Sequence, residues 1–239
     1  MNKKFQNPKR VLLKLSGQAL QGSKDYGIDV DFLNKLAQKL VYLSKYSGIE
    51  LVVVIGGWNI FRWAQLAKNG LDRAMWDYMW MMATVMNGIA ICDAVEKFDQ
   101  PVRVMSAIEI PSVAEKFIKR RAEKHLTKSR IVLCVAGTGN PYNTTDSAAV
   151  LRALELNCDY MIKWTNVDGV YDKDPNKNKN AKKYDSLTLD KALKDEIRVM
   201  DQHAIAMAKE EWLPLFVCNI NKIDKIGSKD MTGTYVEKV

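Results

Sequence analysis

Two lysines and one aspartate stand where a phosphate-handling site would need them. Lys14 and Lys163 each end an otherwise apolar, strand-like run, where an ammonium group is costly unless it reaches an anion or extends to solvent at a strand edge. Asp146 stands where a helical pattern begins, so it is expected to cap that helix. Positive groups that neutralise a transferred phosphoryl are the main protein contribution to phosphoryl transfer. The three residues favour that reaction class.

Three glycine-bearing turns follow apolar runs and could bring the backbone close to a bound anion. They contain Gly17, the pair Gly56-Gly57, and Gly137 with Gly139. Arg62 follows the second turn and could hold phosphate oxygens through two parallel hydrogen bonds, although a lone arginine is more often a surface ion-pair partner. Neither a Walker A pattern nor the HRD and DFG motifs of protein kinases occur, and no Ser-His-Asp arrangement is suggested. The sequence therefore indicates another type of kinase.

Strand-like runs alternate with helical patterns along the whole chain, which predicts a three-layer αβα sandwich with a largely parallel central sheet. The carboxyl ends of its strands would gather the glycine turns at one edge, where such folds bind ligands. Strands are predicted at 11–15, 51–55, 103–106, 131–135, 160–162, 215–219 and 233–236, and helices at 31–44, 74–97, 113–128 and 190–211. The methionine-rich helix at 74–97 is expected to pack in the core or against another subunit, and Asp77 could cap it or bind ligand hydroxyls.

Composition fits an ordinary soluble protein with a real core, since 47% of the residues are hydrophobic and 27% are charged. The four cysteines are scattered in apolar runs without a metal-binding spacing, so we expect reduced core residues in the cytoplasm. Neither a signal peptide nor a membrane span is expected. The net charge of +8 suits small phosphorylated ligands better than nucleic acid, because no nucleic-acid-binding motif accompanies the basic run at 119–130.

Six stretches resemble the bacterial UMP kinases, a family within the amino-acid kinase superfamily, in both order and spacing. They are KLSGQAL at 14–20, VVIGGWNIFR at 53–62, DYMWMMATVMNG at 77–88, GTGNPYNTTDSAA at 137–149, NVDGVYDKDP at 166–175 and VMDQHA at 199–204. The resemblance implies ATP- and Mg²⁺-dependent phosphorylation of UMP to UDP by a cytoplasmic homohexamer that GTP activates and UTP inhibits. It also implies a single amino-acid-kinase-like domain over 1–239, with an acceptor half at about 1–160 and an ATP-binding half at about 161–239.

The same resemblance implies a role for particular residues. ATP would contact Lys14, Leu15, Ser16, Gly17, Trp58, Arg62, Thr165, Asn166, Tyr171 and Asp174. UMP would contact Gly57, Asp77, Thr138, Gly139, Asn140, Pro141, Tyr142, Asn143, Thr144 and Thr145, with Asp77 facing the ribose hydroxyls. Lys14 and Lys163 would stabilise the transferred phosphoryl and Asp146 would organise them. GTP activation would involve Gly22, Gly27, Asp93, Arg103 and Arg130, and Mg²⁺ would arrive with ATP rather than at a resident metal site.

All six tryptophans depart from the family pattern, because they stand where similar sequences have glycine or another small or polar residue. They are Trp58, Trp63, Trp76, Trp80, Trp164 and Trp212. Our hypothesis is that these codons are read as glycine in the source organism, as UGA is in some bacterial codes. If the tryptophans are real, the alternative is a non-catalytic or impaired nucleotide-binding regulatory oligomer of the same fold. A sibling kinase acting on a carboxylate or carbamate and a nucleic-acid-binding regulator are weaker alternatives.

Overall fold

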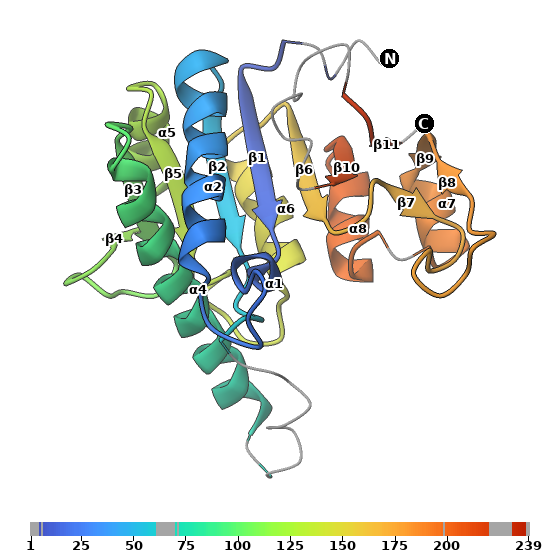
Figure 1. The fold of residues 1–239 in the computed structure, drawn as a ribbon, viewed down its shortest axis with the longest axis horizontal. Coiled ribbons are helices and arrows are strands. Elements are labelled where there is room, and N and C mark those ends of the chain that lie inside the picture. Colours follow the sequence, from blue (N-terminus) through green and yellow to red (C-terminus); the bar gives the residue numbers. More distant parts are fainter. Residues whose placement is uncertain are drawn as a thin grey trace.

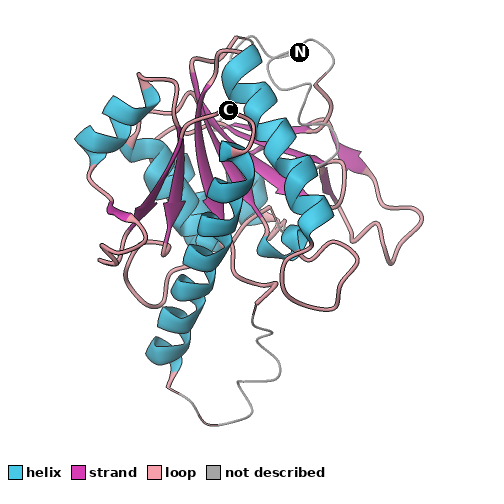
Figure 2. Cartoon of the chain, turned by 60° about the vertical axis from the view of Figure 1, so that its left-hand side comes forward, coloured by secondary structure: helices cyan, strands magenta, loops and turns pink. Residues whose placement is uncertain are grey.

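A nine-stranded sheet crosses the molecule, and helices cover both of its faces (Figures 1 and 2). The computed structural model describes residues 5, 7–60, 70, 72–197, 199–219 and 231–237. The strand order is β4-β3-β5-β2-β1-β6-β10-β11-β9, and every neighbouring pair is parallel except β10 and β11. The predicted αβα architecture with a largely parallel sheet is therefore confirmed.

The elements follow one another with short connections in most of the described chain. The strands of the sheet are β1 Arg10–Leu15, β2 Glu50–Ile55, β3 Val102–Ser106, β4 Glu115–Lys116, β5 Ile131–Val135, β6 Tyr160–Thr165, β9 Ser186–Thr188, β10 Leu215–Asn219 and β11 Thr234–Glu237, and β7 Val170–Tyr171 pairs with β8 Lys183–Tyr184 in a separate ribbon. The helices are α1 Gly17–Leu20, α2 Val30–Val41, α4 Arg73–Glu96, α5 Lys119–Leu126, α6 Thr145–Glu155, α7 Leu189–Lys194 and α8 Gln202–Glu210, and α2 runs on into one π-helical turn, η2 Tyr42–Tyr46.

Alternate residues of each central strand enter different cores, as the period of a strand requires. In β1, Leu13 packs in the core that α2 and α4 share with the sheet, whereas Leu12 packs in the core beneath α5, α6 and α8. The strand between two covered faces is therefore apolar almost throughout. Helix α4 has the length and composition of a membrane span, but 50% of its most apolar stretch is buried inside the structure, as in a core helix.

Two predicted helices are wrong in extent. The helix expected at 113–128 begins only at Lys119, because Glu115 and Lys116 pair with β3 as the edge strand β4. The helix expected at 190–211 is two helices. After α7 the chain turns at Glu196, which has φ of 49°, and Asp201 then caps α8 by accepting a hydrogen bond from the Ala204 N–H.

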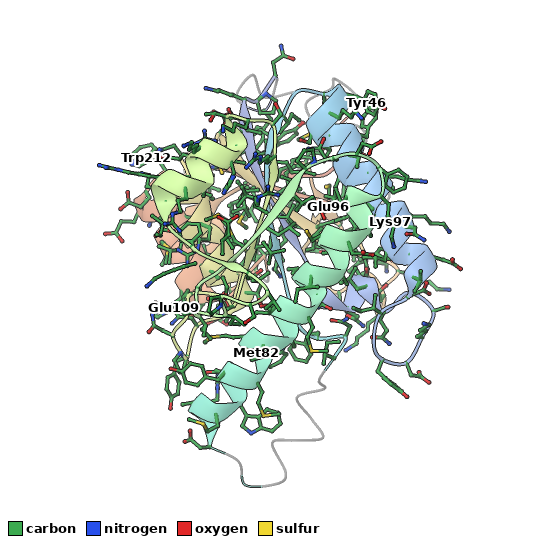
Figure 3. The ribbon with its side chains drawn as sticks, turned by 90° about the vertical axis from the view of Figure 1, so that its left-hand side faces the viewer. Tyr46, Met82, Glu96, Lys97, Glu109 and Trp212 are labelled. Carbon is green, nitrogen blue, oxygen red and sulfur yellow. The ribbon has the colours of Figure 1, made fainter. Side chains whose placement is uncertain are left out.

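Helix α8 ends in a six-residue hydrogen-bonded turn that places Trp212 in a left-handed conformation. The Leu213 N–H donates to the Ala208 carbonyl at 2.9 Å, and Trp212 has φ of 58°. This pattern is a Schellman motif, whose left-handed position strongly favours glycine because a Cβ atom is strained there. The Trp212 side chain is 64% exposed at the surface (Figure 3). The conformation of this turn therefore agrees with the glycine hypothesis.

Replacing Trp212 by glycine is expected to raise the free energy of unfolding by about 1 kcal/mol, because the left-handed strain disappears while little buried surface is lost. Urea denaturation followed by circular dichroism would measure the change. Trp212→Ala is the matched control, since alanine removes the indole but keeps the Cβ atom. An equal gain for both variants would attribute the effect to the exposed indole and not to the backbone.

Candidate functional site

Strand register brings the two lysines side by side at the carboxyl edge of the sheet. Lys14 of β1 and Lys163 of β6 are directly paired positions in neighbouring parallel strands. Both residues alternate with the positions that face α2 and α4, so both side chains lie on the α6 face. The chain leaves β1 toward β2 on one side, while β6 lies on the other. Ligands of open α/β sheets bind at such a crevice.

Asp146 of α6 joins the two ammonium groups. Its Oδ1 lies 2.6 Å from Lys14 Nζ and its Oδ2 lies 2.7 Å from Lys163 Nζ. Burial alone would raise the pKa of Asp146, but the two lysines outweigh it and hold this pKa below its ordinary value. Burial lowers the pKa of Lys163 despite the attraction of Asp146. One carboxylate between two ammonium groups leaves a net positive charge next to the crevice, which suits a phosphoryl group.

Asp146 does not cap α6, so that expectation is wrong. Thr144 is the cap, and its Oγ1 accepts a hydrogen bond from the Ser147 N–H at 3.0 Å. Asp146 lies inside the first turn, which leaves its carboxylate free of capping and able to reach the lysines. The amino end of α6 nevertheless points its dipole toward the loop at 137–144, which favours an anion there.

Asp201 is a site residue that the sequence analysis missed. Its Oδ2 accepts a hydrogen bond from Thr144 Oγ1 at 2.5 Å, and its Oδ1 accepts one from Ser147 Oγ at 3.3 Å. It thereby ties the start of α8 to the start of α6. The helix predicted at 190–211 runs through Asp201, so the sequence did not mark it as a cap, and its other partners are 57 and 54 residues away in sequence, beyond the reach of a local pattern.

A pocket of about 280 Å³ opens beside the start of α6. Its walls come from the β2 turn, α4 and the loop after β5. The lining residues are Trp58, Arg73, Asp77, Trp80, Met81, Thr84, Gly137, Thr138, Asn143, Thr144 and Thr145. Five residues that the resemblance assigned to UMP are among them, namely Asp77, Thr138, Asn143, Thr144 and Thr145. We call this cavity the acceptor pocket.

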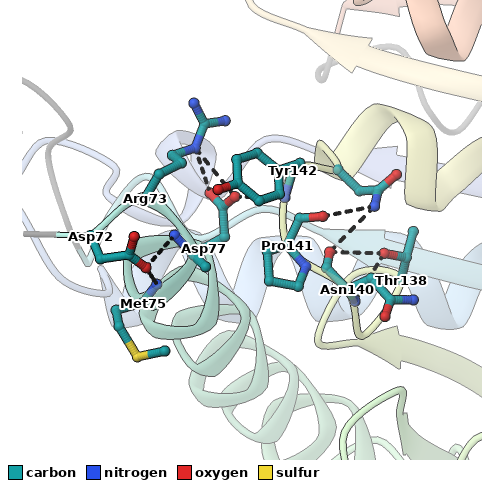
Figure 4. A network of polar contacts seen from close by, with 10 residues as sticks. Asp72, Arg73, Met75, Asp77, Thr138, Asn140, Pro141 and Tyr142 are labelled. Carbon is teal, nitrogen blue, oxygen red and sulfur yellow. Dashed lines mark hydrogen bonds and ion pairs between the residues drawn. The ribbon is translucent and has the colours of Figure 1, made fainter.

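Asp77 anchors the loop of the acceptor pocket (Figure 4). The Tyr142 N–H donates to its Oδ2 at 2.7 Å, and Arg73 Nε lies 3.2 Å from both carboxylate oxygens. Asp77 does not cap α4, because Asp72 accepts the hydrogen bonds of the first turn. Arg73, which the sequence analysis did not single out, stands four residues before Asp77 on the same helix face. The 138–142 segment is held further by Thr138, whose Oγ1 donates to the Asn140 carbonyl.

The first two glycine turns touch each other. A Cβ atom on Gly17 would lie 2.4 Å from the Gly56 carbonyl oxygen, so only glycine allows this approach. Ser16 precedes α1 without a side-chain capping bond, and Leu15 is buried at the end of β1. Gly57 faces α4, because a Cβ atom there would lie 2.5 Å from Trp80 Cδ1. These turns lie beside the lysines, as the sequence predicted.

A second pocket, of about 480 Å³, lies beyond Lys163 at the other side of the crevice. Thr165, Tyr171 and Asp174, which the resemblance assigned to ATP, all line it. Asn166 lies next to them, and its carbonyl accepts a hydrogen bond from Asn219 Nδ2 at 3.0 Å. We call this cavity the donor pocket. Asp146 therefore connects the wall of the acceptor pocket, through Thr145, with Lys163 of the donor pocket.

The residues assigned to GTP activation fall into different parts of the structure. Arg103 Nε lies 3.4 Å from Glu115, which also contacts His125, and Arg130 contacts the other ring nitrogen of His125 at 3.0 Å.

Asp93 forms an exposed ion pair with Lys97 on α4. Gly22 and Gly27 lie elsewhere, in the loop between α1 and α2, with φ of 56° and 84°. Arg62, assigned to phosphate, lies outside the described residues.

The tryptophans differ in how well they fit. Trp58 is 50% exposed over the acceptor pocket and meets Trp80 edge to face, with ring centroids 4.5 Å apart. Trp164 is buried, and its Nε1 has no hydrogen-bond partner among the described residues, which costs about 1–3 kcal/mol. Trp76 is 3% exposed, and its burial gives no support to glycine. Trp63 lies outside the described residues. Trp164 and Trp212 thus fit the fold worst.

No group of three or more histidine, cysteine, aspartate or glutamate side chains in the described part of the chain is arranged to hold a metal ion. The four cysteines form no disulfides with one another, and Cys134 and Cys218 are buried. Burial raises the pKa of the Cys134 thiol to about 12 and that of Cys92 to about 11. Such thiols stay protonated and are poor metal ligands or nucleophiles.

Known proteins share both the sequence and this architecture. The amino acid kinase family model matches residues 9–219. A uridylate kinase of Xanthomonas oryzae pv. oryzae is 51% identical over 232 residues, which cover 96% of each chain. The UMP kinase structure from Bacillus anthracis aligns with a TM-score of 0.92 at 35% identity, covering 97% of this chain and 96% of that one. The UMP kinase of Ureaplasma parvum aligns with a TM-score of 0.90 at 35% identity, covering 96% and 99%. On the strength of these matches and of the lysine-lined crevice, the chain belongs to the amino acid kinase family and is a kinase.

Proposed function

We propose that the protein transfers the terminal phosphoryl group of ATP to UMP and forms UDP. The observation that carries this proposal is the Lys14–Asp146–Lys163 group, which lies between the acceptor and donor pockets. A phosphoryl group moving from one pocket to the other would pass beside both ammonium groups, which can neutralise its developing charge. The relatives named uridylate kinase and UMP kinase support UMP as the acceptor.

UMP would occupy the acceptor pocket, with Asp77 near its ribose hydroxyls and the amino end of α6 near its phosphate. ATP would occupy the donor pocket beside Thr165 and Tyr171, with its phosphates extending toward Lys163 and the Gly17 turn. Mg²⁺ binds through substrate phosphates in many kinases, and the described residues offer no cage of their own. We therefore propose that Mg²⁺ arrives with ATP and that the ion neutralises phosphate charge there. On this assignment the acceptor half is about 1–160 and the ATP-binding half about 161–239.

We further propose a cytoplasmic homohexamer regulated by GTP and UTP. The support for self-association is an apolar stripe on α4, which extends beyond the sheet (Figures 1 and 3). Its exposed residues recur every three or four positions, so they form one helix face. They are Met75, Tyr78, Met82, Met86 and Ile89. A second copy of the chain would cover this stripe with an equivalent one.

UMP-dependent formation of ADP from ATP and Mg²⁺ tests the proposed reaction. We expect ADP release to require UMP. UDP should form in the same amount as ADP. Acetate, glutamate and carbamate are the control acceptors, because sibling kinases of this fold would use a carboxylate or carbamate. Turnover with a control acceptor and none with UMP would contradict the proposal. The test is run on the chain with its six tryptophans and on a variant in which glycine replaces all six. If both chains bind nucleotides and neither turns them over, the regulatory alternative is favoured.

A further inference from the structure

Two asparagine side chains form a closed pair inside the protein, next to the glycine turn of β2. Asn59 is 1% exposed and Asn87, on α4, is 0% exposed. The Nδ2 of Asn59 donates to Oδ1 of Asn87 at 2.9 Å, and the Nδ2 of Asn87 donates back to Oδ1 of Asn59 at 2.7 Å. We call this pair the amide lock. A buried polar pair is expensive unless every donor is used.

The remaining N–H groups of the amide lock reach two backbone carbonyls. Asn87 Nδ2 donates to the Gly56 carbonyl at 2.8 Å, and Asn59 Nδ2 donates to the Gly27 carbonyl at 3.0 Å. The Gly27 N–H also donates to the Asn59 carbonyl at 2.7 Å. Each amide thus uses both of its N–H bonds and its oxygen. The pair connects α4 with two separate loops, the β2 turn and the loop between α1 and α2.

The bond to Gly56 fixes the direction of one peptide plane. No cis peptide bond occurs in the described chain, so the peptide unit between Gly56 and Gly57 is trans. In a trans peptide the C=O and N–H bonds point in opposite directions. Because Asn87 holds the Gly56 carbonyl toward α4, the Gly57 N–H points away from Asn87. A glycine peptide without this bond would have several alternative orientations, since glycine has few steric restraints.

We propose that Asn59 and Asn87 are positioning residues that set the Gly56-Gly57 peptide for phosphate binding and tie it to the 22–27 loop. This inference rests on the proposed function, because the phosphate is that of UMP. Neither asparagine lines the acceptor pocket, so neither touches the substrate there. The turn borders the pocket from behind its wall, since a Cβ atom on Gly56 would lie 3.8 Å from Oγ1 of the lining residue Thr145. Their effect passes through the backbone of the turn, which also presses against Gly17. The simpler reading, a buried pair that only stabilises the fold, makes a different prediction.

Asn87→Leu tests the difference, and Gln100→Leu is the matched control. Gln100 is 4% exposed, and its Nε2 donates to the Ser129 carbonyl at 2.8 Å, near the amino end of β3 and thus at the opposite edge of the sheet. Both changes replace a buried amide by leucine and remove its hydrogen bonds to backbone carbonyls, so both should lower the melting temperature. The drop should be larger for Asn87→Leu, which also leaves the Asn59 amide without its partner. Only Asn87→Leu should raise the KM for UMP, by about tenfold, which is the effect of losing one well-aligned contact.

Hydrogen exchange supplies a readout that does not depend on UMP. In Asn87→Leu, amide exchange should accelerate in peptides covering 17–28 and 55–60, and it should stay at the parent rate there in Gln100→Leu. The milder Asn87→Ser, whose hydroxyl is too short to reach Gly56, should show the same changes more weakly if the leucine variant does not fold. Unchanged exchange in these peptides, or an unchanged KM in a folded variant, would overturn the inference. A parent that exchanges as expected but never phosphorylates UMP would instead overturn the proposed function.

Discussion

A chain with glycine at all six tryptophan positions should turn UMP over about 10²-fold faster than the chain as written. Trp58 and Trp80 meet edge to face on the wall of the acceptor pocket. The Trp80 indole also fills the space that a Cβ atom on Gly57 would enter. Glycine at these two positions would open the pocket and expose the backbone of the turn to the phosphate. The comparison requires ADP formation by both purified chains at the same concentrations of ATP, Mg²⁺ and UMP.

Two partial variants separate the causes of this effect. Trp58→Gly with Trp80→Gly should recover most of the activity, because these residues line the pocket. Trp164→Gly with Trp212→Gly should change stability more than turnover, because one carries a buried unpaired N–H and the other a left-handed backbone. Equal activity of the written and all-glycine chains would show that the site tolerates the indoles. An intact mass of the native protein that fits six tryptophans would reject the codon hypothesis outright.

Replacing Lys163 by methionine should lower kcat by about 10²–10³-fold, measured in whichever of the two chains is active. Methionine preserves the length of the side chain but removes the ammonium group that lies 2.7 Å from Asp146. The developing charge on the transferred phosphoryl then loses one of its two protein cations, while ATP still enters the donor pocket. The KM for UMP should therefore change much less than kcat, because Lys163 does not line the acceptor pocket.

The matched control for this prediction is Lys35→Met, the same change at an exposed position of α2. It should leave both kcat and KM at the parent values. Lys163→Arg restores the positive charge in a larger, planar group and should recover part of the lost rate. A kcat for Lys163→Met close to that of the parent would mean that Lys163 serves only to compensate the buried Asp146 charge.

Local sequence patterns were sufficient for seven of the nine strands of the sheet, all but β4 and β9, and for the longest helix. The apolar runs at 51–55 and 131–135 are strands β2 and β5, and the helix predicted at 74–97 is α4, Arg73–Glu96. Such elements have a periodicity that their own residues determine. The edge strand β4 and the break between α7 and α8 could not be found in this way, because β4 exists only through pairing with β3.

The site was predicted as a set of residues but not as a geometry. Lys14, Asp146 and Lys163 come together because they lie on three separate elements, β1, α6 and β6. The glycine-bearing turns in the sequence indicated only where elements end. The capping role expected of Asp146 from its position is wrong, because Thr144 is the cap. Its role as the carboxylate that organises the lysines came only from the resemblance, since those partners lie in distant strands. Asp201, Asn59 and Asn87 were missed because their contacts are long-range hydrogen bonds between polar residues of ordinary type.

Because Lys14 pairs directly with Lys163, the Lys14–Asp146–Lys163 group depends on the register that β1 and β6 adopt during folding. A shift of β1 by one residue against β6 would turn Lys14 to the opposite side of the sheet, into the apolar layer beneath α2 and α4. Single-residue insertions within these strands are therefore incompatible with turnover even where the chain still collapses. A change of length in the loops at the amino ends of these strands leaves the register intact. We therefore expect these loops to tolerate insertions and deletions.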